Sequence, residues 1–270
     1  MAERLRPSIE GFDAGYVDVA GLATWHEVRG EGPAVVLLHG GFSGAAGWAL
    51  QAPALVKAGF RVHAPERRAH GHTADVEGPL SYAVMAKDTI DYLEVALGER
   101  AHLVGWSDGA VVALLVAQLR PDLVDRVVLI GQYFNSSGRV ENSELMALLR
   151  TDDAKDFLRR SYDPISPDGP DHFDVVYDKM LAMIDSDPEI DLDSLGGVCA
   201  PTLVIQGDRD EVMLDHSAAV AASLTDGRLA VLPGSHLLPI ELPEVVNCLL
   251  VAFLHDHVPC WRQVSAPGRE

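Results

Sequence analysis

The sequence has few cysteines and no long hydrophobic run. Its 3 cysteines are Cys199, Cys248 and Cys260, and no two of them have the C-x-x-C spacing. An odd number of isolated cysteines predicts neither a disulfide framework nor a zinc site. The longest apolar stretch, Val245–Leu254, is interrupted by Asn247 and covers only about half of a bilayer. We therefore predict no membrane-spanning segment and no membrane partner.

Basic residues are also scarce. The 270 residues include 21 Lys and Arg but 40 Asp and Glu, which gives a formal net charge of −19. An acidic surface repels phosphate, so we predict that nucleic acid is not a partner. The N-terminal segment MAERLRPSIEGFDAG lacks the apolar region of a signal peptide. We expect a cytoplasmic protein, and the sequence does not indicate its oligomeric state.

The chain alternates strand-like and helix-like segments. Apolar runs bounded by glycine or proline predict strands at Tyr16–Leu22, Ala23–Arg29, Ala34–Leu38, Phe60–Ala64, His102–Gly105, Arg126–Ile130, Thr202–Gln206 and Leu229–Leu232. Apolar residues at helical spacing predict helices at Ala46–Ala58, Tyr82–Leu97, Ser107–Leu119, Ser143–Arg160, His172–Asp185, His216–Leu224 and Leu242–His257. Strands separated by helices of this length indicate an α/β fold with a mostly parallel sheet.

The alternation is interrupted between about Tyr133 and Gly197, where the sequence predicts helices but no strand. We interpret this segment as a helical insertion. The predicted organisation is a core domain formed by residues 1–132 and 198–270, with residues 133–197 inserted between its two parts. The final residues, VSAPGRE, are predicted to be frayed.

One pentapeptide carries a chemical signal. Gly105-Trp106-Ser107-Asp108-Gly109 fits the pattern G-x-S-x-G and lies between a predicted strand and a predicted helix. A sharp turn at that junction exposes the serine oxygen above the sheet, and the flanking glycines allow the strand and helix to approach. We predict that Ser107 is a nucleophile.

A serine hydroxyl needs a base, and the base needs an orienting carboxylate. His236 follows the last predicted strand and is our candidate base. Asp210, in Gly-Asp-Arg-Asp after another strand, is our candidate carboxylate, with Asp208 as the second choice. The carboxyl ends of parallel strands meet at one edge of a sheet, so Ser107, Asp210 and His236 are expected to converge there.

The negative oxygen of a tetrahedral intermediate needs hydrogen-bond donors. The segment His39-Gly40-Gly41-Phe42 follows a predicted buried strand, and its small residues leave backbone N–H groups accessible. We predict that the oxyanion hole is formed by the N–H of Gly41, or of Phe42, together with the N–H of Asp108. His39 is expected to be structural.

These motifs together resemble the α/β-hydrolase superfamily. The resemblance rests on HGG at 39–41, GWSDG at 105–109, GDRD at 207–210 and GSH at 234–236. It implies the α/β-hydrolase fold, with a mostly parallel eight-stranded sheet flanked by helices and a helical cap inserted after strand six. Residues 66–73, ERRAHGHT, resemble the family's D-x-R-G-H-G-x-S loop but carry Glu66 and Ala69 in place of Asp and Gly.

Within the superfamily, the chain resembles the serine esterases related to valacyclovir hydrolase. Ser107 argues against the epoxide hydrolase and haloalkane dehalogenase branches, which have an aspartate at that position. In the esterase branch the acidic residue after the serine attracts a substrate ammonium group, and Asp108 matches it. The alternative is that Asp108 only accepts structural hydrogen bonds.

Several other residues are candidates for contact with a substrate or a metal. We predict that Phe42, Trp106, Met180 and Met183 bind substrate. The pairs His70-x-His72 and His255-x-His257 each lack a third ligand at convincing spacing, so no metal site is predicted.

The expected activity is hydrolysis of small-molecule carboxylic esters, thioesters or lactones through an acyl-enzyme on Ser107, with no cofactor. Other chemistry on the same three residues stays open: hydrolysis of a carbon–carbon bond, amide cleavage or cofactor-free perhydrolysis. A ligand receptor with vestigial turnover is a further alternative.

Overall fold

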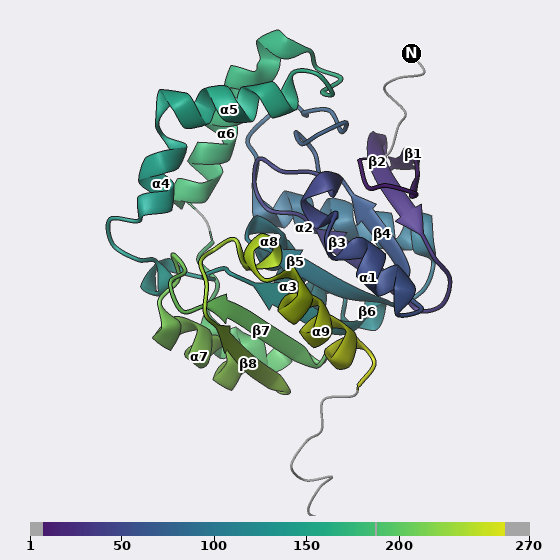
Figure 1. The fold of residues 1–270 in the computed structure, drawn as a ribbon, viewed down its shortest axis with the longest axis vertical. Helices are drawn as coiled ribbons and strands as arrows, with labels where there is room; N and C mark the ends of the chain where they lie inside the picture. Colours follow the sequence, from purple (N-terminus) through teal and green to yellow (C-terminus); the bar gives the residue numbers. More distant parts are fainter. Residues whose placement is uncertain (1–7, 187, 257–270) are drawn as a thin grey trace, which may run out of the picture.

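In the computed structural model, residues 8–186 and 188–256 are described, and the predictions for His257, Cys260 and the terminal tail lie outside them. The described residues form a single eight-stranded sheet in the order β1-β2-β4-β3-β5-β6-β7-β8 (Figure 1). Its strands are β1 (Asp13–Val19), β2 (Leu22–Arg29), β3 (Ala34–Leu38), β4 (Arg61–Pro65), β5 (Ala101–Trp106), β6 (Val124–Ile130), β7 (Thr202–Gly207) and β8 (Gly227–Leu232). Strand β2 pairs antiparallel with β1 and with β4, and the other pairs are parallel, which confirms the predicted sheet.

Helices cover both faces of the sheet (Figure 1). The α-helices of the described residues are α1 (Ala52–Lys57), α2 (Tyr82–Tyr92), α3 (Asp108–Leu119), α4 (Glu144–Leu149), α5 (Asp152–Tyr162), α6 (Phe173–Ser186), α7 (Leu214–Ser223), α8 (Leu238–Glu241) and α9 (Pro243–Leu254). Apolar residues of α1 and α9 pack on one face, and those of α2, α3 and α7 pack on the other. The chain thus folds as three layers, with the sheet in the middle.

The central strands are buried on both faces. In β3, Val35 and Leu37 pack against the α1 and α9 layer, whereas Val36 and Leu38 pack against the α2 and α3 layer. All residues of β3 are buried. Burial on both sides explains why the parallel strands read as continuous apolar runs in the sequence.

Two of the predicted helices are each divided in the structure. The predicted helix Ala46–Ala58 consists of a 3₁₀ turn, Ala45–Trp48, followed by α1, which has a proline in its first turn. Proline lacks an N–H group and fits only the first turn of a helix, so α1 begins there. The predicted helix Ser143–Arg160 is divided into α4 and α5 because Thr151 caps α5, its hydroxyl accepting a hydrogen bond from the N–H of Ala154.

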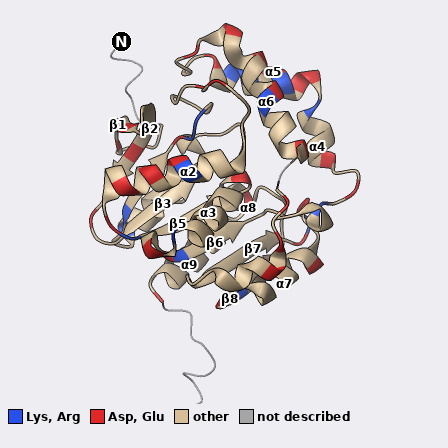
Figure 2. Cartoon of the chain, turned by 180° about the vertical axis from the view of Figure 1, so that it is seen from behind, with Lys and Arg blue, Asp and Glu red and all other residues tan. Residues whose placement is uncertain are grey.

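The segment between β6 and β7 contains α4, α5 and α6, which lie over the carboxyl ends of the strands (Figure 1). We call residues 133–197 the cap; these domain boundaries stay a prediction. Acidic residues occur along both core and cap, and several basic residues gather on α5 and α6 (Figure 2). Among the helices in residues 8–186 and 188–256, none has the length and apolar character needed to cross a bilayer.

Candidate active site

Ser107 lies at the turn between β5 and α3 with an unusual backbone conformation. Its φ is 55° and its ψ is −126°, a region that residues other than glycine rarely adopt. The turn requires glycine on both sides of Ser107, because neither position has room for a side chain. A Cβ on Gly105 would overlap the carbonyl of Gly109, and a Cβ on Gly109 would overlap the carbonyl of Leu38. The Ser107 N–H donates to the carbonyl of Ile130 at 2.8 Å, which fixes the turn to β6.

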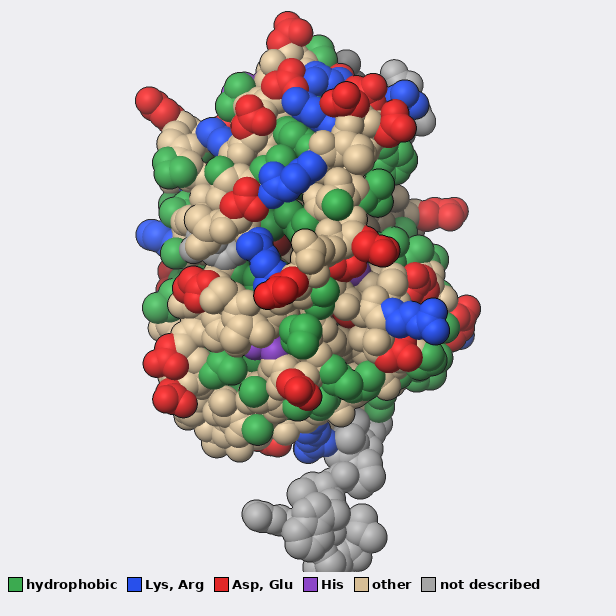
Figure 3. Space-filling view, turned by 90° about the vertical axis from the view of Figure 1, so that its left-hand side faces the viewer, with side chains coloured by type: hydrophobic (Ala, Val, Ile, Leu, Met, Phe, Trp, Pro, Cys, Tyr) green, Lys and Arg blue, Asp and Glu red, His purple; other side chains and the backbone are tan. Residues whose placement is uncertain are grey.

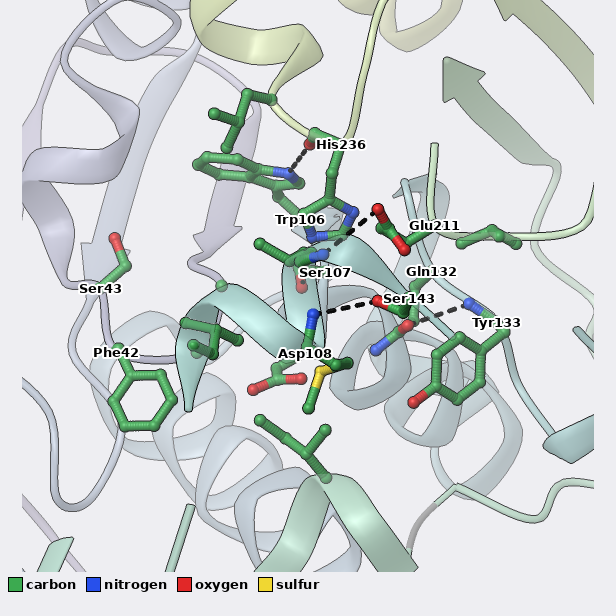
Figure 4. Close-up of a pocket in the computed structure, with 18 of the residues that line it drawn as sticks. Phe42, Ser43, Trp106, Ser107, Asp108, Gln132, Tyr133, Ser143, Glu211 and His236 are labelled. Carbon is green, nitrogen blue, oxygen red and sulfur yellow. Dashed lines mark hydrogen bonds between the residues drawn. The ribbon is translucent and has the colours of Figure 1, made fainter. Parts of the chain in front are cut away.

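The structure brings Ser107, His236 and Asp210 together at the carboxyl ends of β5, β7 and β8. The Oγ of Ser107 lies 3.0 Å from Nε2 of His236, and Nδ1 of His236 lies 2.9 Å from Oδ1 of Asp210. Figure 4 shows the His236 imidazole next to Ser107, with Trp106 beside it. The indole N–H of Trp106 donates to the carbonyl of His236 at 2.9 Å and so holds the histidine loop against β5.

Asp210 and Asp208 occupy different environments. The Asp210 side chain is fully buried, and its Oδ1 also accepts from the N–H of Glu211 at 2.7 Å. Asp208 is exposed and accepts from the N–H of Gly234, which stabilises the turn before His236. The structure therefore places the first-choice carboxylate, and not the second, beside the histidine.

Gly131 is a supporting residue that the sequence analysis missed. Its φ is +60°, and a Cβ there would lie 2.9 Å from Oδ2 of Asp210 and 3.4 Å from Nδ1 of His236. Glycine at this position allows the end of β6 to pack directly under the Asp210–His236 pair. The signal was present in the sequence as a glycine directly after a strand, but its neighbours come from distant segments.

The environment of His236 favours its protonated form. Burial lowers the pKa of His236, but the hydrogen bond and negative charge of Asp210 outweigh burial, so the pKa lies above its ordinary value of 6.5. A carboxylate that stabilises the imidazolium is the arrangement that allows a histidine to accept a proton from a serine.

The loop after β3 runs along the other side of Ser107. A Cβ on Gly40 would lie 3.4 Å from Cβ of Ser107. The loop is held from below by the buried His39, whose Nε2 accepts from the N–H of Arg67 and whose Nδ1 donates to the carbonyl of Gly40. Asp108 is the first residue of α3, where N–H groups have no acceptor within the helix. Both predicted oxyanion donors, Gly41 and Asp108, line the same cavity.

The Asp108 carboxylate is buried, and only 4% of the residue is exposed. Its Oδ1 accepts from the hydroxyl of Tyr82 at 2.6 Å, and its Oδ2 has no hydrogen-bond partner among the described residues. Burial raises the pKa of Asp108, although the Tyr82 hydroxyl and the Arg67 guanidinium act in the opposite direction. Tyr82 and Arg67 were not anticipated from the sequence.

A cavity of about 190 Å³, which we call the first cavity, opens over Ser107. Phe42 and Trp106 line it (Figure 4). Residues of the cap, such as Met146 and Leu149, also line it. Arg139 and Glu211 contribute charged groups to its wall.

Two predicted substrate-contact residues do not line the first cavity. Met180 lines a second cavity on the far side of Phe42. Met183 is buried in the apolar core and lines neither cavity, so the structure places it away from both spaces, and its role as a substrate contact stays a prediction. Both methionines lie on α6. Their helical spacing predicted buried apolar residues but could not distinguish a residue packed in the core from one that contacts a substrate.

The loop formed by residues 66–73 is built around Glu66. Its carboxylate accepts from the N–H groups of Ala45 and His72 and from Nδ1 of His72. His70 is also buried, and its Nδ1 donates to the carbonyl of Arg68. Across residues 8–186 and 188–256, no three His, Cys, Asp or Glu side chains are grouped so as to hold a metal ion.

Comparison with solved structures supports the fold. The 2-hydroxy-6-oxo-6-phenylhexa-2,4-dienoate hydrolase of a Rhodococcus species matches with a TM-score of 0.74, and the match covers 90% of this chain and 99% of that one. The two sequences are 22% identical, so this likeness concerns the fold alone.

Comparison with protein sequences identifies the family. A pyrrolizixenacetamide deacetylase of Xenorhabdus hominickii is 29% identical over 84% of this chain and 92% of its own length. A putative carbamate hydrolase, RutD, of Variovorax paradoxus is 31% identical over 90% of this chain and 97% of its own length. Because these relatives have different named activities, the resemblance to valacyclovir-hydrolase-like esterases stays a prediction. Residues 35–247 match the model of the alpha/beta hydrolase family, and the chain belongs to that family.

Proposed function

We propose that this protein is a serine hydrolase that cleaves small-molecule carboxylic esters, thioesters or lactones. The observation that carries the proposal is the continuous chain of hydrogen-bond contacts from Ser107 Oγ through His236 to Asp210, at 3.0 and 2.9 Å. These distances are within the range required for proton transfer between a nucleophile and its base. The apolar cavity above Ser107 is where the substrate binds.

In the first half of the reaction, the Ser107 oxygen attacks the substrate carbonyl while His236 Nε2 accepts the hydroxyl proton. The carbonyl oxygen becomes negative and is stabilised by the N–H groups of Gly41 and Asp108. The carbon–oxygen bond to the alcohol then breaks, and His236 returns the proton to the leaving alcohol. Asp210 stabilises the imidazolium throughout without taking its proton.

In the second half, a water molecule attacks the acyl carbon and gives its proton to His236. The second tetrahedral intermediate collapses, the bond between Ser107 and the acyl group breaks, and Ser107 regains its proton. The products are the acid and the alcohol, and no cofactor takes part.

The direct test is labelling with a fluorophosphonate followed by mass-spectrometric mapping of the modified residue. We expect the label on Ser107 and a fall in kcat for p-nitrophenyl acetate of about 10⁴-fold or more in Ser107→Ala. The circular dichroism spectrum and Tm of the variant control for folding. Turnover by the folded variant within tenfold of the wild type would exclude this mechanism.

A panel of substrates can separate esters from the alternative substrates. The names of the relatives include a deacetylase and a carbamate hydrolase, whose scissile bonds involve nitrogen, and the structural neighbour is named as a dienoate hydrolase. Parallel assays with an acetate ester, the matching acetamide, a vinylogous diketone and a peroxide donor would identify the preferred reaction. Labelling of Ser107 with turnover on the amide alone would replace the ester proposal with amide cleavage.

We further propose that Asp108 favours esters that carry an amino group. Its Oδ2 is buried without a hydrogen-bond partner among the described residues, and the residue lines the first cavity beside Ser107. A buried carboxylate gains more from a nearby ammonium group than an exposed one does. Because burial raises its pKa, the preference should weaken as the pH falls through that raised value.

The variant Asp108→Asn tests this preference, because the amide oxygen still accepts the Tyr82 hydrogen bond. We expect kcat/KM for an alanine ester to fall at least tenfold relative to the matching propionate ester, because the charge pair is lost. The wild-type ratio of these two esters is the control. Equal losses on both esters would show that Asp108 is only structural.

A further inference from the structure

A second cavity of about 260 Å³ lies beside the first, between the cap and two core loops. Its core side is formed by residues 42–46 and 66–72, and its cap side by α5, α6 and the segment that joins them. The proposed hydrolysis does not use it. A cavity of about 150 Å³ is enough to bind benzene, so this space can hold a ring or a chain of several carbons.

The wall of the second cavity offers little to a charged ligand. Leu158, Ile165, Phe173, Val176 and Met180 form its apolar cap side. On the polar side most groups already have hydrogen-bond partners within the fold, so the cavity favours an uncharged hydrocarbon group.

Most polar groups of this wall have hydrogen-bond partners within the fold, although Nε2 of His70 has none among the described residues. Glu66 accepts hydrogen bonds from Ala45 and His72. The Tyr162 hydroxyl donates to Asp168 at 3.2 Å. Burial lowers the pKa of His70 to about 3, so its imidazole is neutral. A charged ligand would lose its hydration here, and the neutral imidazole of His70 would replace little of it.

Phe42 and Leu158 separate the two cavities, since both side chains line both spaces. The Phe42 ring lies against Tyr177 of α6, with the ring centroids 5.6 Å apart. The φ of Phe42 is 55°, a conformation that is strained for a bulky residue. A conformation of this kind persists only where the surrounding contacts hold the backbone in place, so the side chain and not the backbone of Phe42 has to move to open the boundary.

We propose that the second cavity is a binding chamber for an uncharged hydrocarbon part of the substrate, which enters it past Phe42 and Leu158. The proposal rests on the hydrolase function of the first cavity but adds a substrate class: esters with an extended apolar chain or ring. The scissile carbonyl stays at Ser107 while the hydrocarbon part occupies the chamber.

Binding can be measured without turnover by titrating Ser107→Ala with linear 1-alkanols from butanol to decanol in a calorimeter. We expect the Kd to fall about fourfold for each methylene group that enters the chamber. Failure of the wild type to hydrolyse any ester would leave this measurement intact, so the two proposals fail separately.

Two adjacent valines of α6 provide a matched pair of variants. Val176 is 2% exposed and lines the chamber, whereas Val175 is 44% exposed. In the Ser107→Ala background, Val176→Trp should fill the chamber and abolish the chain-length dependence, and Val175→Trp should preserve it. Ile165→Trp fills the chamber from another segment if Val176→Trp does not fold. A folded chamber-filling variant that binds decanol as tightly as its parent would overturn the proposal.

Turnover then shows which part of the ester uses the chamber. One series lengthens the acyl chain of p-nitrophenyl esters, and the other lengthens the alcohol of alkyl acetates. Phe42→Ala should raise the ratio of kcat/KM for the longest to the shortest substrate at least tenfold in one series. Chain-length independence in both series, with hydrolysis intact, would contradict the proposal.

Discussion

The sheet edge that carries Ser107, Asp210 and His236 and the cap are held in place by different interactions. At the sheet edge, Ser107 and Asp210 follow β5 and β7, whose residues are all buried. His236 follows β8, a partly exposed outer strand that pairs with β7 along its whole length. On the cap, Arg159 and Asp174 form one of several exposed ion pairs, and Figure 3 shows basic and acidic side chains interspersed over the cap in its upper part. Exposed pairs contribute about 0–1 kcal/mol each.

This difference assigns separate tasks to the two regions. Reacting atoms must be held within a fraction of an ångström, which a buried sheet provides. The cap forms much of the wall of both cavities. We infer that the chemistry depends on the sheet edge and that substrate selection depends on the cap.

The largest expected effect within this comparison comes from Asp210→Asn. The amide can donate to Nδ1 of His236 and leave Nε2 protonated, so that it cannot accept the Ser107 proton. We expect kcat to fall by about 10⁴-fold with little change in Tm, measured with the ester that the wild type prefers. Asp208→Asn, which changes an exposed residue two positions earlier in the same segment, is the matched control and should change kcat less than twofold.

The contact between Asp210 and His236 also predicts how kcat/KM of the wild type depends on pH. Because Asp210 raises the pKa of His236 above 6.5, the protonated and inactive form persists above that pH. The kcat/KM should therefore rise with pH through a value higher than 6.5. A rise centred well below 6.5 would contradict the described geometry.

The next effect is that of Gly131→Ala. Alanine at a φ of +60° is strained, at a cost of about 1 kcal/mol, and its Cβ would displace the Asp210 carboxylate. We expect kcat to fall about tenfold or more, because small displacements of catalytic groups are costly. Gly98→Ala, at a φ of +67° away from any close neighbour, carries the same strain. Gly98→Ala should lower the free energy of unfolding without lowering kcat. An equal loss of kcat in both variants would count against a role for Gly131.

The site residues at the sheet edge could be predicted because each one is marked by residues next to it in the sequence. The strand before Ser107, the turn glycines and the helix after it are consecutive residues, and the Asp210 and His236 loops follow strands in the same way. The sequence could rank Asp210 above Asp208 as the partner of His236 but could not decide between them. The choice depends on how their loop packs against Gly131, which follows another strand.

The cap could be predicted only as a group of helices. Its apolar periodicity marked Met180 and Met183 equally, but one lines a cavity and the other is packed in the core. The boundary at Thr151 depends on a single hydroxyl that competes with helix continuation. The second cavity arises from contacts between Phe42, Leu158 and residues 66–72, which are distant in sequence, so no local pattern reveals it.

The smallest expected effect concerns the attachment of the cap to the core. Asp75, in the loop after β4, accepts hydrogen bonds from Lys179 at 2.6 Å and His172 at 2.9 Å, both in the cap. Burial raises the pKa of Asp75, but the hydrogen bonds from Lys179 and His172 outweigh it and leave the pKa below its ordinary value. The stabilisation is therefore present above the ordinary pKa of an aspartate and is lost as the pH falls through the lowered one.

Asp75→Asn should lower the free energy of unfolding by about 1 kcal/mol at pH 7, which corresponds to a Tm lower by roughly 2–4 °C. The difference from the wild type should vanish in urea titrations at a pH below the lowered pKa, where both proteins carry a neutral group at this position. Asp185→Asn, which removes an exposed ion pair with Arg150 inside the cap, is the control and should leave Tm nearly unchanged. If the two variants lost equal stability at every pH, the contact at Asp75 would be no stronger than an ordinary surface pair, and the cap would have to be held by its apolar contacts alone.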